Sequence, residues 1–287
     1  METNLLRIEK GDTETEGLAT TVFFFHIHKT AGLTMRSILK NQYRNKPYII
    51  FNADNKNSFT MNDYLALSEA ERSKLKLVMG HMPFGLHRYH RNPCAYFAFL
   101  RNPLDRLASL YYYSLQKQGP IHDEIEKYKM TLADFLASDF AHTLDNFQIR
   151  MIMNEKLLDN TIVYELDPYE SWMLESAKKR IENHFLIVGI TELFDESIML
   201  LHHTFGWSTP FYSKVNVSSS KPEVLPVTMS DIQAFTDRNE ADYKLYEFAL
   251  VRLKLQLLMM GEDFAQEVQA FKIFKDSNLI ASLSAKT

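Results

Sequence analysis

The stretch at residues 22–34 reads VFFFHIHKTAGLT, and its character changes abruptly in the middle. Six strand-forming residues (22–27) are followed by a polar turn that contains a lysine, a glycine and two threonines. A buried strand usually ends in ordinary turn residues, and a lysine at such a point needs a reason. We interpret this turn as a loop that binds a phosphate group.

The residue types of this loop suit an anion. Gly32 lets the backbone approach the ligand, and successive N–H groups from Thr30 to Thr34 can point at phosphate oxygens. The following helix adds the partial positive charge of its N-terminus, Lys29 adds a full charge, and the two threonine hydroxyls add donors. The alternative is an ordinary turn with a solvated lysine. The Walker spacing GxxxxGK[ST] is absent because Lys29 precedes the glycine, which disfavours a magnesium-dependent NTPase.

Short apolar runs alternate with helical patterns along the chain. A pattern of this kind predicts an α/β fold with a mostly parallel central sheet flanked by helices. We expect a single domain over 21–287 after a flexible segment at 1–20. The predicted strands are 22–27, 48–51, 75–80, 95–100, 161–166 and 185–190, and the predicted helices are 34–43, 103–117, 145–158, 169–183, 192–205 and further helix within 229–275.

Composition limits the function classes. The chain has 287 residues and a net charge of −4, so no overall basic character indicates a nucleic-acid partner. Cys94 is the single cysteine, which rules out an internal disulfide bond. The N-terminal residues are too polar for a signal peptide, and no apolar run reaches about 18 residues. We therefore expect a cytoplasmic protein with no membrane contact.

A second motif occupies residues 95–113, AYFAFLRNPLDRLASLYYY. Arg101 directly follows a buried-looking strand, Asn102 is a plausible N-cap, and a proline takes the first helical position. Ser109 lies two turns into that helix, where it and Arg101 could hold a second phosphate. The alternative is that Arg101 pairs with Asp105 and that Ser109 is a neutral surface residue.

Together, the pattern xxKTxGxT after a strand and RxPxxRxxSxYYY about 70 residues later resembles the sulfotransferases that use 3′-phosphoadenosine 5′-phosphosulfate (PAPS). The likeness is to the carbohydrate group that contains the heparan sulfate 2-O- and 6-O-sulfotransferases, and it implies a P-loop-like sulfotransferase fold. It implies that Arg101 and Ser109 bind the 3′-phosphate. It also implies that the 5′-phosphosulfate is bound by the first loop, residues Lys29, Thr30, Ala31, Gly32, Leu33 and Thr34. Two positions depart from the family pattern, His28 in place of proline and Leu33 in place of a hydroxyl residue.

His81 ends the run LKLVMGH and is followed by a turn. Sulfuryl transfer needs a base for the acceptor hydroxyl, and a histidine suits that role near neutral pH. The related sulfotransferases carry a histidine in a similar GH element as their base, which implies this role for His81. Lys29 is expected to share in catalysis by stabilising charge on the leaving phosphate. A lone histidine at a strand end is otherwise more often structural.

Other polar groups give weaker signals. His26 is expected to be packed, the run LHRYHR (86–91) is either a solvated basic loop or a contact for an anionic acceptor, and His202 and His203 are core or surface. Since no HExxH or CxxC spacing occurs, no metal is expected. A late loop at 213–222 could close over the nucleotide through Ser218, Ser219 and Lys221, and Trp207 or Phe211 could stack on adenine.

These observations predict a PAPS-dependent sulfotransferase that sulfates a hydroxyl-bearing acceptor, releases 3′-phosphoadenosine 5′-phosphate (PAP) and needs no metal. Its acceptor is a saccharide by resemblance, although a small natural product or polar metabolite fits equally well. Two alternatives from other classes are a nucleotide kinase or NTPase and a non-catalytic PAP-binding module.

Overall fold

A computed structural model describes residues 20–51, 59–156, 166–212 and 222–284 of the chain. Within these ranges the centre is a five-stranded sheet in the order β2-β3-β1-β4-β5, and all neighbouring strands run parallel. The strands are β1 (Thr21–Phe25), β2 (Tyr48–Phe51), β3 (Leu77–Gly80), β4 (Cys94–Leu100) and β5 (Phe185–Ile190). The predicted α/β fold with a parallel central sheet is therefore confirmed. The run predicted as a strand at 161–166 lies outside the described residues, apart from its last position.

Hydrophobic packing explains why β1 lies at the centre. All five of its residues, TVFFF, are buried, as a parallel strand covered on both faces requires. Its last residue, Phe25, is paired with Gly80 of β3 on one side and with Ala98 of β4 on the other. The carboxyl ends of these three strands therefore meet at one edge, where ligands bind in open α/β sheets.

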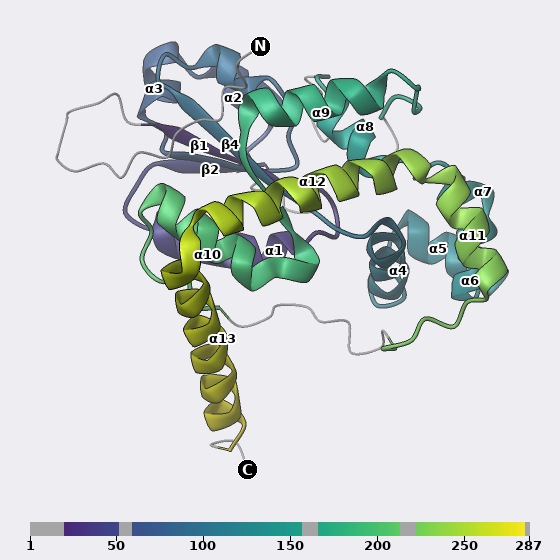
Figure 1. Cartoon of the computed structure of the whole chain (residues 1–287). Coiled ribbons are helices and arrows are strands. Elements are labelled where there is room, and N and C mark those ends of the chain that lie inside the picture. Colours follow the sequence, from purple (N-terminus) through teal and green to yellow (C-terminus); the bar gives the residue numbers. More distant parts are fainter. Residues whose placement is uncertain (1–19, 52–58, 157–165, 213–221, 285–287) are drawn as a thin grey trace.

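Helices surround the sheet (Figure 1). The first group is α1 (Gly32–Gln42), α2 (Met61–Ala66), α3 (Glu69–Lys74), α4 (Pro103–Ser114), α5 (Pro120–Tyr128), α6 (Leu132–Ala137) and α7 (Asp139–His142). The second group is α8 (Phe147–Met153), α9 (Met173–His184), α10 (Phe194–Phe205), α11 (Met229–Arg238), α12 (Glu240–Met259) and α13 (Gly261–Ser284). Short 3₁₀ turns occur at Leu86–Tyr89 and Thr191–Leu193.

The predicted helices between strands correspond to α1, α4, α8, α9 and α10, and the predicted C-terminal helical region contains α11, α12 and α13. The short helices α2, α3 and α6 were not predicted, although each begins with a capping box that the sequence displays. Their N-caps are Thr60, Ser68 and Thr131. In Figure 1, α1 and α10 lie on one side of the sheet, and α2, α3 and α9 lie on the other.

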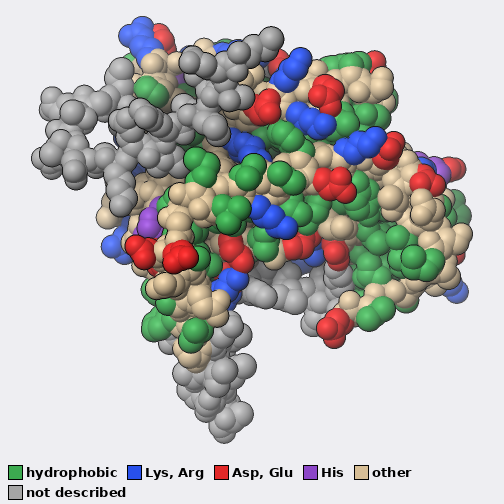
Figure 2. Space-filling view, viewed as in Figure 1, with side chains coloured by type: hydrophobic (Ala, Val, Ile, Leu, Met, Phe, Trp, Pro, Cys, Tyr) green, Lys and Arg blue, Asp and Glu red, His purple; other side chains and the backbone are tan. Residues whose placement is uncertain are grey.

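The C-terminal helices have different surroundings. α12 runs across the molecule beside β5, and α13 projects away from its body (Figure 1). Figure 2 shows hydrophobic side chains among the charged ones over α12, and Val251, Leu255 and Leu258 are exposed there. None of the helices in the described ranges combines the length and the apolar character that a membrane span requires.

Candidate active site

The loop after β1 has an unusual backbone. Lys29 and Ala31 both have positive φ angles, 67° and 61°, although neither residue is glycine. The left-handed conformation costs a non-glycine residue about 1–2 kcal/mol, and it is found more often at functional sites. Ala31 is also the N-cap of α1 and provides no side-chain acceptor for the first N–H groups of that helix. A loop of this shape at a helix N-terminus is suited to hold an anion.

Two residues of the loop have roles that the sequence did not indicate. A Cβ atom at position 32 would lie 1.6 Å from Nε2 of His26, so Gly32 makes room for that imidazole. Thr30 is fully buried, and its hydroxyl donates to the carbonyl of Ile27 at 2.8 Å. This hydroxyl closes the loop in the present structure, and its donation to a ligand stays a prediction. Leu33 is exposed and Thr34 is buried.

The structure brings Lys29 and Arg101 together, as the sequence predicted for residues at one sheet edge. Nη1 of Arg101 donates to the carbonyl oxygen of Lys29 at 3.2 Å. Nε of Arg101 is buried and has no hydrogen-bond partner within the described residues. Burial, followed by the charge of Arg101, lowers the pKa of Lys29 to about 8. Lys29 and Arg101 are two partly buried positive charges that repel each other, so a bound anion would stabilise both of them.

The helix after β4 completes this side of the site. α4 begins as predicted, because Oδ1 of Asn102 accepts from the backbone N–H groups of Leu104 and Asp105 at 3.1 and 3.2 Å. The ammonium of Lys29 lies 3.6 Å from the ring centroid of Tyr113, a contact that the sequence analysis missed. Ser109 is one turn before Tyr113 on the same face of α4, so it lies on the face toward the loop.

A buried polar network fixes the backbone of Arg101. The side chain of Gln148 in α8 accepts from the backbone N–H of Arg101 at 3.0 Å and donates to its carbonyl at 2.9 Å. The carboxylate of Asp242 in α12 accepts from the backbone N–H groups of Gln148 and Ile149 at 3.0 and 2.9 Å. This chain of contacts fixes the backbone from which the guanidinium extends. The buried glutamine in the helical run FQIRMIM, whose other residues except Arg150 are apolar, was the available signal for it.

Three histidines form a stack at the same edge. The ring of His81 lies between two others, with its centroid 3.6 Å from that of His28 and 4.2 Å from that of His26. The rings of His28 and His81 are nearly parallel, with an interplanar angle of 3°. The expected packing of His26 is confirmed, since it is 7% exposed. The sequence analysis noted His28 as a departure from the family pattern but did not predict its contact with His81.

Hydrogen bonding defines the tautomer of His81. Its Nδ1 lies 2.9 Å from the carbonyl oxygen of His26, and a carbonyl can only accept, so Nδ1 carries the proton. In the neutral ring the lone pair is then on Nε2. Burial, and next the neighbouring His81, lower the pKa of both His26 and His28 well below the ordinary value. The flanking rings are therefore uncharged at neutral pH.

The other predicted contacts have mixed outcomes. In the run LHRYHR, His87 bonds to the hydroxyl of Tyr96, Arg88 pairs with Glu155 at 3.1 Å, and Arg91 pairs with Glu69 at 2.6 Å, as in a structural loop. Adenine stacking on Trp207 is wrong for this structure, because that ring is buried against Phe97 and Phe205. Phe211 is exposed but contacts Phe271 and Phe274 of α13.

The residues of the predicted late loop, Ser218, Ser219 and Lys221, lie outside the described residues.

Comparison with known proteins identifies the family. A family model described as galactose-3-O-sulfotransferase matches residues 9–280. A Drosophila melanogaster protein described as heparin sulfate O-sulfotransferase is 25% identical over 217 residues, which cover 71% of this chain and 62% of that protein. The chain thus spans less than two thirds of that relative's length. The resemblance to carbohydrate sulfotransferases is confirmed, and this chain belongs to the galactose-3-O-sulfotransferase family.

Proposed function

We propose that this protein transfers a sulfuryl group from PAPS to a hydroxyl group of a saccharide. The observation that carries the proposal is the juxtaposition of Lys29 and Arg101 around a loop with two left-handed residues. One cation and the loop suit the 5′-phosphosulfate, and the other cation, with Ser109, suits the 3′-phosphate. The donor has phosphate groups at both of these positions, so its charges match the two cations of this edge.

The mechanism is an in-line displacement at sulfur. PAPS, when bound, supplies a sulfur atom that is already attached to a phosphate leaving group. Nε2 of His81 accepts the proton of the acceptor hydroxyl as the new S–O bond forms and the bond from sulfur to the phosphate oxygen breaks. Lys29 and the N–H groups of its loop stabilise the negative charge that develops on that phosphate. These groups are already oriented before reaction, which lowers the barrier without a further cofactor.

A galactose hydroxyl is our first choice of acceptor. The family model that names galactose matches almost the whole chain, whereas the relative that names heparin sulfate is covered only in part. The test is incubation of the purified chain with ³⁵S-labelled PAPS and a panel of galactosides, heparan sulfate fragments and small hydroxylated metabolites. We expect an added sulfate on a galactoside by mass spectrometry. Labelling of a metabolite alone would contradict the saccharide assignment, and no labelling at all would contradict the enzyme assignment.

Arg101→Ala should weaken PAP binding by about 1.5–3 kcal/mol, the scale of a hydrogen bond to a charged group. Isothermal titration calorimetry of PAP measures this directly. Arg91→Ala is the matched control, because this arginine is exposed and pairs with Glu69, and its PAP affinity should be that of the wild type. Equal affinity of the Arg101 variant and the wild type would refute the phosphate contact.

PAP affinity should fall at alkaline pH. The pKa of Lys29 is about 8 in the free protein, and a bound phosphate would raise it. Below pH 8 the lysine is already charged, whereas above it binding must take up a proton, so the dissociation constant should rise by up to about tenfold per pH unit. In Lys29→Arg the charge persists at all these pH values, and the dependence should vanish. A wild-type affinity that does not change up to about pH 10 would show that Lys29 does not contact the phosphate.

A further inference from the structure

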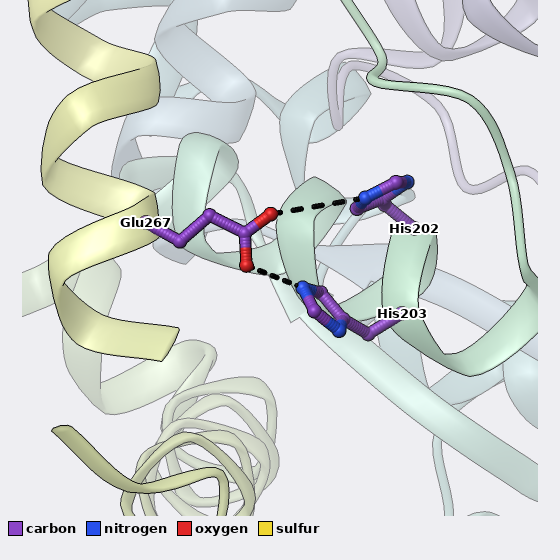
Figure 3. Close-up of side chains that lie close together, drawn as sticks. All are labelled: His202, His203 and Glu267. Carbon is purple, nitrogen blue, oxygen red and sulfur yellow. Dashed lines mark hydrogen bonds and ion pairs between the residues drawn. The ribbon is translucent and has the colours of Figure 1, made fainter. Parts of the chain in front are cut away.

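A second group of chemically active side chains lies away from the sheet edge. His202 and His203 are in the last turn of α10, and both face Glu267 of α13 (Figure 3). Nε2 of His203 lies 2.7 Å from one carboxylate oxygen, and Nε2 of His202 lies 3.9 Å from the other. The three possible ligand atoms lie within 4.8 Å of one another. Neither helix carries any of the residues assigned to sulfuryl transfer.

We propose that His202, His203 and Glu267 bind a divalent transition metal ion, and that Zn²⁺ fits them best. Two imidazoles and one carboxylate are a donor set that zinc uses in proteins, with water as the fourth ligand. Ligand atoms about 2.0–2.2 Å from a tetrahedral ion lie roughly 3.3–3.6 Å apart. The separations are 2.7 Å from His203 to one carboxylate oxygen and 3.9 Å from His202 to the other, and all three ligand atoms lie within 4.8 Å of one another, so side-chain rotations would have to bring them to the tetrahedral spacing.

The surroundings favour a cation at this position. The C-terminal turn of α10 has the partial negative charge of a helix end, and Glu267 adds a full negative charge. The nearby lysines of α13 are neutralised, since Lys272 pairs with Glu196 and Lys275 pairs with Asp195. The side chains of His203 and Glu267 are 36% and 43% exposed, so a hydrated ion can reach them and retain a water molecule.

The ion would join two helices that are distant in sequence. α13 packs on α10 through buried side chains such as Phe264, Val268 and Phe271 and through the two lysine ion pairs. A metal bound by ligands from both helices adds a crosslink to this interface. Its effect is therefore stabilisation of the docked α13, and it does not depend on the sulfotransferase assignment.

The test uses the full chain without a polyhistidine tag. Zn²⁺ titrated by calorimetry should bind at one saturable site, and at a hundredfold excess over the dissociation constant it should raise the melting temperature by about 5 °C or more. His203→Ala and Glu267→Gln should each abolish both effects.

His142→Ala is the matched control, because His142 is an exposed histidine 3.9 Å from a single carboxylate, that of Asp139. It should bind Zn²⁺ as the wild type does. Co²⁺ gives an independent readout, since tetrahedral coordination produces an intense visible absorption that should disappear in both site variants. Absence of saturable Zn²⁺ binding in the wild type, or binding that survives both substitutions, would overturn the proposal.

Discussion

Replacing His81 with alanine should lower kcat by about 10²–10⁴-fold, the usual contribution of a general base. The reason is the tautomer of this ring, whose Nδ1 donates to the carbonyl of His26 and leaves the lone pair on Nε2. PAP affinity should change little, since the proposed phosphate contacts come from Lys29 and Arg101. Steady-state kinetics with a galactoside acceptor and calorimetry with PAP together measure the two effects.

His81→Asn separates the base from the hydrogen bond. The asparagine amide can still donate to the carbonyl of His26, but it cannot take a proton from the acceptor. We therefore expect the asparagine variant to be as inactive as the alanine variant. Restoration of activity by asparagine would mean that His81 acts only by holding the loop. His142→Ala, on the exposed surface, is the control and should retain wild-type turnover.

Asp242→Ala should destabilise the fold by several kcal/mol, because it leaves two buried backbone N–H groups without an acceptor, at about 1–3 kcal/mol each. Asp242 is 1% exposed, and Arg106, whose charge interacts with it, is 2% exposed. Without the carboxylate, the N–H groups of Gln148 and Ile149 lose their acceptor, and Arg106 keeps its charge in an apolar site. Urea denaturation followed by circular dichroism gives the change in unfolding free energy.

The matched control for this variant is Glu240→Ala, two residues earlier in α12. Glu240 is exposed and pairs with Lys244 at 2.7 Å, so its removal should cost less than about 1 kcal/mol. The folded fraction of the Asp242 variant should also bind PAP more weakly, because Gln148 positions the backbone of Arg101. A loss of stability no larger than that of the Glu240 variant would show that the network is not structurally important.

Much of the site could be predicted because it follows from the ends of strands. Continuous apolar runs gave the strands, and parallel strands end at one edge, so Lys29, His81 and Arg101 were expected to meet there. The family match covers the residues of these motifs. The N-cap of α4 was also predictable, since Asn-Pro after a buried strand has a local steric and hydrogen-bonding cause.

The contacts that hold these residues could not be predicted, because they join distant segments. Gln148 and Asp242 are 94 positions apart, and no local pattern links them. The stack of His28 on His81 depends on the packing of two loops, and the contact that a Cβ at position 32 would make with the imidazole of His26 likewise depends on the fold. The one sequence feature that indicated the buried network was the polar residue Gln148 among the apolar residues of α8.

The left-handed backbone at Lys29 and Ala31 has a consequence for the kinetics of donor binding. The rest of the fold must compensate for this strain when the chain folds, before any nucleotide is present. The loop that contains Lys29 and Ala31 is therefore already in its strained conformation when the nucleotide binds, and no part of the binding free energy is needed to bend it. In stopped-flow experiments, no slower rearrangement of residues 29–31 should accordingly follow the association of PAP with this loop.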